Sequence, residues 1–513
     1  MPEAGSLDLL RHQASTVLPG YALNSLLLAL GVGIGVAVLG GATAAAVTLF
    51  EFPGRRLFSW ALLLPLAMPA YVLAYATTDF LQFSGPLQTA LRQSSGATGP
   101  LWPDVRSLPG AVLLFTLALY PYVYLLTRAA LLERGLHLME AARLLGAGLW
   151  QRIFGVALPL ARPAVAAGVA LALMETLADY GVGSYFGLAT FTTGIYKAWL
   201  SMDDRIAAAQ LATLLLAVVG VLLWVERRAQ ARLRFAGSRA GQHGREARPT
   251  QLAGHRAALA LLLCAAPVLL GFVLPVGVLL HGVWREASYG EFGLPWQRFL
   301  GWAGTSLQLS TLAALAALAV ALPIGFVLRQ SPRGMVRPLA RLVSLGYAVP
   351  GAVIAVGLLG PVGWVQTALP GSAVAGGVTA LVTGSIGGLL YAYLVRFSAV
   401  ALQSVEAGYA RIPHSLDDTA RTLGASSARL FFGVHAPLLM RSALSAALLV
   451  FVDVMKELPA TLILRPFDSD TLAVVAYQFA RDERLAEAAL PSIAIVAVGL
   501  IPVLLLSRAM RER

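Results

Sequence analysis

Residues 140–146 read Glu-Ala-Ala-Arg-Leu-Leu-Gly, and residues 418–424 read Asp-Thr-Ala-Arg-Thr-Leu-Gly. In each stretch the glycine stands six positions after the acidic residue, and a proline, Pro159 or Pro437, stands thirteen positions after the glycine. The two stretches match at a constant offset of 278 in the numbering. Such self-similarity across half of a chain indicates an internal repeat, and it predicts two structurally related halves.

Other matched positions extend the repeat toward the start of each half. Ser25 matches Ser306 at an offset of 281, and Pro69 matches Pro350 at the same offset. The halves are therefore expected to run parallel, with the same elements in the same order.

The composition is typical of a membrane protein. Of the 513 residues, 58% are hydrophobic and 12% are charged, and the mean hydropathy is +0.74. A soluble domain carries about 25% charged residues. The apolar residues lie in blocks of about 20 or more, the length that a helix needs to cross about 30 Å of hydrocarbon. We predict an all-α polytopic membrane protein.

A bilayer also explains the basic excess. The formal net charge of +12 would suggest nucleic acid in a soluble chain, but lysine and arginine gather in the cytoplasmic loops of membrane proteins. We expect the lipid bilayer as a partner, and no nucleic acid. Cys264 is the only cysteine, which excludes an internal disulfide and a thiolate metal cluster.

Eleven spans are expected from the apolar blocks. The segment 183–200 contains Lys197 and is short, so it fits a re-entrant or surface helix better; counting it would give twelve. The expected spans are 22–49, 58–80, 109–131, 162–181, 206–226, 257–283, 302–328, 340–362, 375–400, 442–463 and 488–507. With the C-terminus inside, most of the 38 lysine and arginine residues are cytoplasmic, and so are both repeated stretches.

A linker is expected between the halves. Residues 227–256 are basic and contain glycine, which is typical of a connection between domains. The predicted transmembrane domains are therefore 1–226 and 257–513. The span 257–283 has no counterpart in the first half, and it returns the chain to the outer side so that the second half can start as the first does.

The loops at 134–160 and 411–438 are each predicted to form a helix–turn–helix bracket. A carboxylate in the first turn suits the helix dipole, and Gly146 or Gly424 can end that helix with a positive φ. A short amphipathic helix follows, which the proline should break and redirect into the next span. Membrane-surface anchoring would explain one such loop. Two matched copies favour docking sites for two copies of a soluble partner.

The pattern Glu-Ala-Ala, glycine, Leu-Pro resembles the EAA loop of the membrane subunits of ABC importers. In that family the loop's short helix fits a groove on the ATP-hydrolysing subunit. The resemblance implies two pseudo-symmetric type I importer transmembrane domains, a bacterial inner-membrane location and two copies of a cytoplasmic ATPase subunit. It assigns the coupling role to Glu140, Ala141, Gly146, Pro159, Asp418, Ala420, Gly424 and Pro437.

The second copy departs from the family pattern at three positions. Asp418 replaces the glutamate, Thr419 an alanine and Ala436 the leucine, so the copies can differ in strength. No G-x-x-x-x-G-K-[ST] phosphate-binding motif occurs in the chain. We therefore expect no enzyme activity and no cofactor in this chain, with ATP bound by the partner subunits.

Paired acids follow each loop. Glu175 and Asp179 in the first half match Asp453 and Glu457 at the same offset of 278. Acids four residues apart share one helical face, and charges inside a span often mark a pathway. The four carboxylates, with Lys456, are predicted to line a pathway or gate, and such oxygen ligands favour a hard cation. Pairing with Lys456 or with backbone, in a purely structural role, is the alternative.

Several stretches are similar to the fused permeases of ferric-iron ABC importers. They are residues 175–181, 192–196, 454–461, 465–467, 470–473 and 482–488. The similarity implies ferric iron as substrate, delivered by a periplasmic or lipoprotein binding protein that docks on the outer loops 82–108, 182–205, 284–301 and 464–487. Permeases for thiamine, phosphonates or polyamines are alternatives within the same class.

Two other classes of function fit part of the pattern. A proton-coupled secondary transporter would use the paired acids but leaves the doubled loop without a role. A membrane scaffold would use the loops and leave the acids without one. His137, His414 and His435 are interpreted as surface histidines. Tyr196 and Tyr477, matched at offset 281, are expected to pack on the outer surface.

Overall fold

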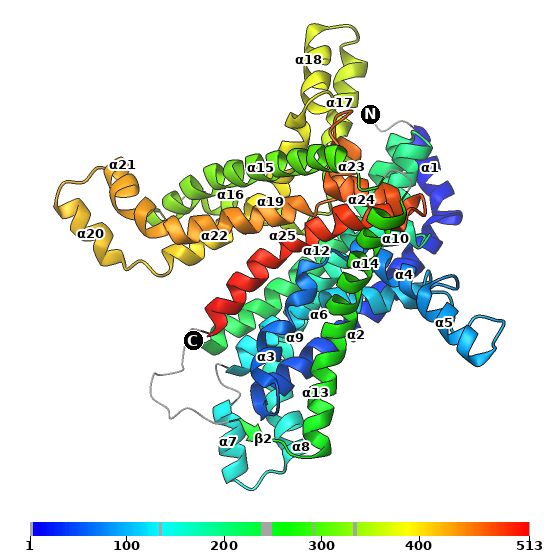
Figure 1. Ribbon diagram of the computed structural model, residues 1–513. Helices are drawn as coiled ribbons and strands as arrows, with labels where there is room; N and C mark the ends of the chain where they lie inside the picture. Colours follow the sequence, from blue (N-terminus) through cyan, green and yellow to red (C-terminus); the bar gives the residue numbers. More distant parts are fainter. Residues whose placement is uncertain (1–3, 133–135, 238–248, 291–292, 332–335, 512–513) are drawn as a thin grey trace. The chain divides into compact units, whose positions relative to one another are not determined.

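The computed structural model describes residues 4–132, 136–237, 249–290, 293–331 and 336–511. Within these ranges the chain is almost entirely helical (Figure 1). Its sheet is a parallel pair of two-residue strands, β1 (Phe50–Glu51) and β2 (Thr250–Gln251).

The described elements before the linker are α1 (Ala4–Ser15), α2 (Leu18–Leu49), α3 (Arg55–Ala61), the 3-10 turn η1 (Leu64–Ala67), α4 (Ala70–Leu81), α5 (Pro86–Ser95), α6 (Leu108–Ala130), α7 (Leu136–Leu144), α8 (Leu149–Arg152), the π-turn η3 (Ile153–Ala157), α9 (Leu158–Ala178), α10 (Gly181–Tyr185), α11 (Phe191–Tyr196), the π-turn η4 (Lys197–Ser201) and α12 (Arg205–Gly237).

Those after it are α13 (His255–Val268), the π-turn η5 (Leu269–Val273), α14 (Leu274–Tyr289), α15 (Trp296–Gln330), α16 (Val336–Val343), the 3-10 turn η6 (Gly346–Ala348), α17 (Gly351–Ala368), α18 (Ala373–Val382), α19 (Ile386–Tyr409), α20 (His414–Thr422), α21 (Ser427–Leu430), the π-turn η7 (Phe431–His435), α22 (Ala436–Met455), α23 (Pro459–Leu464), α24 (Leu472–Arg481) and α25 (Leu485–Arg511).

The predicted class of fold is confirmed. Ten of the described helices are long and apolar enough to cross a membrane, or eleven if the bent pair Arg55–Ala67 and Ala70–Ser95 is one span. The segment 183–200, predicted to be a poor span, forms the short elements α10, α11 and η4. Helices are the expected solution because a bilayer offers backbone groups no water to bond with.

Five of the predicted spans are interrupted, and the breaks in 162–181 and 442–463 follow Ala178 and Met455. The span 58–80 bends by 94° at its break. The span 340–362 is divided before α17, and 375–400 is divided between α18 and α19. The breaks in 58–80 and 340–362 fall at matched prolines: Pro69 (ψ 142°) precedes α4 and Pro350 (ψ 140°) precedes α17. An extended ψ and the missing N–H stop a helix at that position.

The chain forms two compact units, one made of Met1–Leu294 with Ala476–Arg513 and the other of Pro295–Val475. In the first unit α2, α6, α9 and α12 pack together, and α25 packs on α14. In the second unit α15, α19 and α22 pack together. The domain division predicted at 227–256 follows the repeat rather than these contacts, and it stays a prediction.

The same hydrogen bond, from a backbone N–H to a serine side chain, recurs in both repeats. Ser25 Oγ on α2 accepts from the N–H of Phe191 at 3.2 Å, and Ser306 Oγ on α15 accepts from the N–H of Leu472 at 2.8 Å. Phe191 and Leu472 match at the offset of 281 that the two serines share. Each buried serine therefore caps the short helix that follows an interrupted span.

Close helix packing in the first unit depends on Gly40. A Cβ at this position of α2 would lie 2.7 Å from the carbonyl oxygen of Tyr120 on α6, whereas a Cβ at the neighbouring Gly41 would meet nothing within 4 Å. Small residues permit such approach between membrane helices.

We expect Gly40→Ala to destabilise the protein by about 1–3 kcal/mol, because the methyl group forces α2 away from α6. Gly41→Ala is the matched control, since it changes the same helix in the same way without the clash. The measurement is the thermal unfolding midpoint in detergent. Equal midpoints for the two variants would contradict the packing described here.

Candidate functional site

The first repeated loop consists of α7, a tight turn and α8. Gly146 has φ +84°, and its N–H donates to the carbonyl of Arg143 while the N–H of Ala147 donates to that of Ala142. These two bonds form a Schellman turn, which needs a residue that tolerates positive φ. Residues 134 and 135 of the predicted loop lie outside the described residues.

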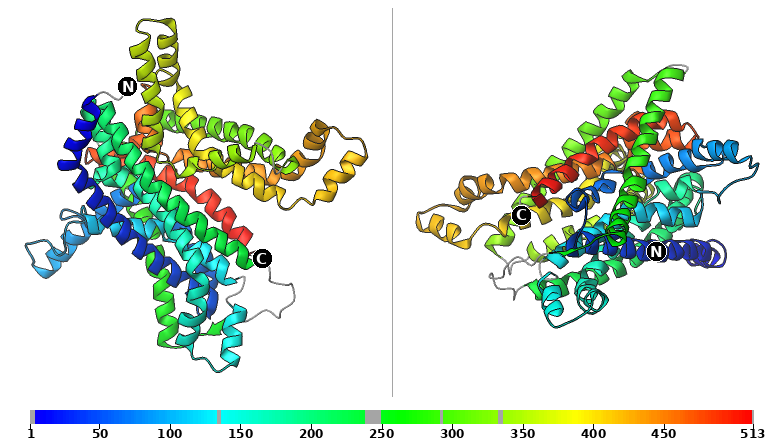
Figure 2. Two further views of the ribbon diagram at one scale, coloured as in Figure 1. Left: turned by 180° about the vertical axis from the view of Figure 1, so that it is seen from behind. Right: turned by 60° about the horizontal axis from the view of Figure 1, so that its bottom comes forward.

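The second loop repeats this turn between α20 and α21. Gly424 has φ +81°, its N–H donates to the carbonyl of Arg421, and the N–H of Ala425 donates to that of Ala420. Each bond matches its counterpart at the offset of 278. The predicted helix–turn–helix bracket is therefore present twice, with the glycine in the predicted conformation. The predicted place of Glu140 and Asp418 in the first helical turn is wrong, because each is the fifth residue of its helix. Figures 1 and 2 show α7 with α8, and α20 with α21, each at one end of the long helices of its own unit.

The prediction that the prolines break the second helix of each bracket is wrong. The helix continues through Pro159 into α9 and through Pro437 into α22, so that Trp150–Ala178 and Ser427–Met455 are each a single span. The π-turns η3 and η7 end two residues before the two prolines. A π-turn changes the local hydrogen-bond register and can accommodate a residue that lacks an N–H.

Both loops present apolar side chains to solvent. Leu145 and Leu423, matched at offset 278, are 88% and 81% exposed, and Leu144, Trp150 and Phe432 are exposed as well. Most of the predicted coupling residues are exposed with them, and Ala420 is half-buried. Exposed apolar side chains clustered on a loop are typical of a surface that a partner covers.

Arg329 joins the second loop to the helices of its unit. Its guanidinium donates to both carboxylate oxygens of Asp417, at 2.8 and 3.1 Å. It also donates to the carbonyl oxygens of Tyr409, Ile412 and Pro413, at 3.0 to 3.1 Å. All five N–H groups of the arginine are thus used, and its side chain is 4% exposed. One residue of α15 therefore holds the end of α19 and the start of α20.

His435 completes this buried network. Its Nε2 lies 2.9 Å from Oδ1 of Asp417, and its Nδ1 lies 3.5 Å from the hydroxyl of Tyr409. Burial opposes ionisation of Asp417, but the bonds and charges of Arg329 and His435 outweigh it and lower the pKa of Asp417 to about 2. The interpretation of His435 as a surface histidine is wrong, because its side chain is fully buried.

Sequence reasoning missed Arg329 and Asp417. It selected the exposed Asp418, because that residue matches Glu140 in the repeat, whereas Asp417 matches the apolar Met139. The sequence did contain a signal for this pair, because the two repeats differ in character at matched positions. Asp417 stands where the first repeat has Met139, and His435 stands where it has Ala157.

The paired acids lie where the spans end. Helix α9 ends at Ala178 and α22 ends at Met455, so Asp179 and Glu457 stand beyond the helices that carry Glu175 and Asp453. The prediction that each pair shares one helical face is therefore wrong. The cause is the interruption of both spans at this point, with α10 and α23 starting directly afterwards.

Two of these acids cap the short helices. Asp179 accepts from the N–H of Val182 at 2.7 Å. Glu457, which is buried, accepts from the N–H groups of Ala460 and Thr461 at 2.9 and 3.0 Å. Such bonds satisfy helix N–H groups that have no partner within the helix.

Basic side chains accompany the acids of the second half. Glu457 forms an ion pair with Arg396 at 3.4 Å, and Asp453 forms one with Lys456 at 2.9 Å. Glu175, like Asp179, is only half-buried. Among the residues that the structure describes, no group of three or more His, Cys, Asp or Glu side chains is placed to hold a metal ion.

Tyr196 and Tyr477 pack inside the first unit, so the expectation that they pack on its outer surface is wrong. The ring of Tyr196 stacks on that of Tyr180 at 3.7 Å. The hydroxyl of Tyr477 bonds with those of Tyr180 at 3.2 Å and Ser184 at 2.8 Å. The two matched tyrosines are buried, and their contacts attach the short helices α11 and α24, which carry them, to neighbouring residues of the unit.

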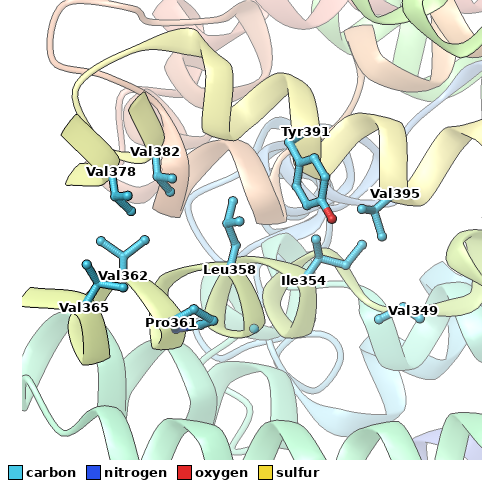
Figure 3. A pocket seen from close by; sticks show the side chains of 11 residues that line it. Val349, Ile354, Leu358, Pro361, Val362, Val365, Val378, Val382, Tyr391 and Val395 are labelled. Atoms are coloured by element: carbon cyan, nitrogen blue, oxygen red, sulfur yellow. The ribbon is translucent and has the colours of Figure 1, made fainter. Parts of the chain in front are cut away.

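The second unit also contains an apolar pocket, which Figure 3 shows. It is an open pocket with a volume of about 510 Å³, and α17, α18 and α19 line it with side chains that include Leu358, Val378 and Tyr391. Apart from the hydroxyl of Tyr391 the labelled side chains are apolar. This lining suits hydrocarbon rather than a bare cation.

A family profile, described as the inner membrane component of binding-protein-dependent transport systems, matches residues 37–234 and again 321–512. The chain belongs to this family. Each match includes one of the repeated loops, so this permease carries the family's transmembrane domain twice in one chain. The predicted type I importer fold is thereby confirmed.

Curated relatives agree with this assignment. The permease is 24% identical to an Fe(3+)-transport system permease protein of Haemophilus influenzae, over 94% of this chain and 89% of the relative. A molybdenum transport system permease protein of the same species is 29% identical over 36% of this chain and 82% of its own length. A putative 2-aminoethylphosphonate transport system permease protein of Salmonella choleraesuis is 29% identical over 39% and 72%.

Gly424→Ala is expected to loosen the second loop. A Cβ there would meet nothing within 4 Å, so the cost is purely conformational, about 1–2 kcal/mol for an L residue at positive φ. Gly433→Ala is the control, because Gly433 has equal space and no positive φ. Hydrogen exchange at the amides of residues 424 and 425 should rise in the first variant only. Equal exchange in the two variants would show that φ does not determine the order of the loop.

Proposed function

We propose that this permease is the membrane subunit of an ATP-driven importer for ferric iron. In this proposal each repeated loop docks one copy of a cytoplasmic ATPase subunit, and the two loops and the C-terminus face the cytoplasm. The doubled Schellman turn, with exposed Leu145 and Leu423 beside it, is the observation that carries the proposal. A secondary transporter gives this duplicated surface no role, and a scaffold that recruits a soluble partner leaves the paired acids without one.

The chain itself is not proposed to bind ATP. It has no glycine-rich phosphate-binding loop followed by lysine, so the energy comes from the partner subunits. The substrate is delivered by a periplasmic or lipoprotein binding protein, which docks on the outer loops. This assignment is supported by membership of a family whose members act with binding proteins.

Ferric iron is the favoured substrate for two reasons. The relative with Fe(3+) in its name aligns over 94% of the chain, whereas the molybdenum and aminoethylphosphonate relatives align over 36% and 39% of it. Residues 454–461 and 175–181 are similar to ferric permeases.

The acids at the span ends are proposed to form part of the pathway or gate. Asp179 and Glu457 hold the breaks at which the spans give way to α10 and α23, and Glu175, Asp453 and Lys456 lie within one helical turn of these breaks. Discontinuous helices with charged groups are the usual way to place polar atoms inside a bilayer.

The proposal predicts ATP-dependent ferric uptake in proteoliposomes that contain the permease, its ATPase subunit and its binding protein. Gly146→Ala and Gly424→Ala should each lower uptake, and Gly155→Ala and Gly433→Ala should not, because only the first pair disturbs the turns. Ferric ion is compared with thiamine, molybdate and 2-aminoethylphosphonate. Uptake of one of these in place of iron would contradict the substrate, and uptake without ATP would contradict the class of transporter.

A further inference from the structure

The two loops are joined to their helices by different kinds of interaction. In the first unit the joint contains an apolar cluster, in which Leu49, Leu131 and Met139 pack with Ala157 and Ala161, and the buried Arg152 belongs to the same loop. All five side chains of the cluster are buried. In the second unit the joint is the network of Arg329, Tyr409, Asp417 and His435.

The two joints occupy the same place in the repeat. Leu131 matches Tyr409, Met139 matches Asp417, and Ala157 matches His435, each at the offset of 278. Arg329 matches Thr48 at the offset of 281 that Ser25 and Ser306 share. At these four matched positions the first half thus has apolar or small residues, and the second half has the four residues of the polar network.

Folding alone does not require this exchange. Replacing a buried ion cluster by apolar side chains of similar size is often neutral or stabilising, and the first unit shows that apolar packing closes the same joint. The charges must therefore be explained by something other than holding the loop in place.

Directional bonds provide rigidity that apolar contacts lack. Any tilt of α20 would leave part of the Arg329 guanidinium or the Asp417 carboxylate unpaired in a buried site, which is costly. Apolar contacts are non-directional, so α7 can shift on its cluster with a smaller penalty. The network thus specifies one angle between α20 and the helices α15 and α19.

We propose that Arg329, Tyr409, Asp417 and His435 are positioning residues that make the second loop the rigid link to its ATPase subunit, while the first loop is the compliant one. This inference rests on the proposed function and adds that the two coupling sites are mechanically unequal. Movement of a docked subunit passes from α20 through Arg329 directly to α15 and α19. In the first half it passes through side-chain packing.

A fourfold exchange tests the proposal. The variant Arg329→Thr, Tyr409→Leu, Asp417→Met and His435→Ala gives the second joint the residues of the first. It should unfold close to the wild-type temperature and still bind the ATPase subunit. The amount of substrate taken up per ATP hydrolysed should fall, by between about twofold and thirtyfold, the usual range for residues that carry coupling. An unchanged ratio would overturn the proposal.

Arg329→Lys provides the second variant. Lysine keeps the charge but has three donors in place of five and lacks the planar fork, so this change alone should lower the ratio of uptake to hydrolysis. Met139→Leu in the first joint is the matched control and should leave the ratio unchanged. If the fourfold variant does not fold, a wild-type ratio in Arg329→Lys overturns the proposal. Loss of ATP-dependent uptake in the wild-type assembly would instead contradict the proposed function itself.

Discussion

A loop outside the membrane can move a span only if it is held against that span. This constraint explains why each repeated loop has a buried face as well as an exposed one. Met139 and Asp417 face their own helices, whereas the neighbouring Glu140 and Asp418 face outward. The inward residues connect the bracket to the transmembrane helices, and the outward residues remain available to a partner. The two repeats meet the same requirement with apolar packing in one case and with buried charges in the other.

The interruptions of the spans follow from a second constraint. A helix that stops inside a bilayer leaves N–H and carbonyl groups without water, so other protein groups must satisfy them. Ser25 and Ser306 do this for α11 and the start of α24, and Glu457 does it for α23. Since the serines recur at a fixed offset, the interruptions are part of the repeat.

Much of this organisation was predictable from the sequence, and the failures have physical causes. The repeat, the helical fold and the positive φ of Gly146 and Gly424 follow from local rules of spacing and backbone sterics. The continuation of α22 through Pro437 was not predictable, because a π-turn depends on the whole hydrogen-bond register. The role of Asp417 was missed because its partner Arg329 is 88 residues away in the chain. Pairings over that distance are set by packing.

Docking of an ATPase subunit on each loop is the central claim, and site-directed crosslinking tests it most directly. Cysteine is placed at Leu145 or Leu423 in the Cys264→Ala background, with the similarly exposed Phe467 as control. Each loop cysteine should form an adduct with the ATPase subunit, and the double variant should carry two subunits per chain. Adducts no more abundant at Leu145 and Leu423 than at Phe467 would contradict the account.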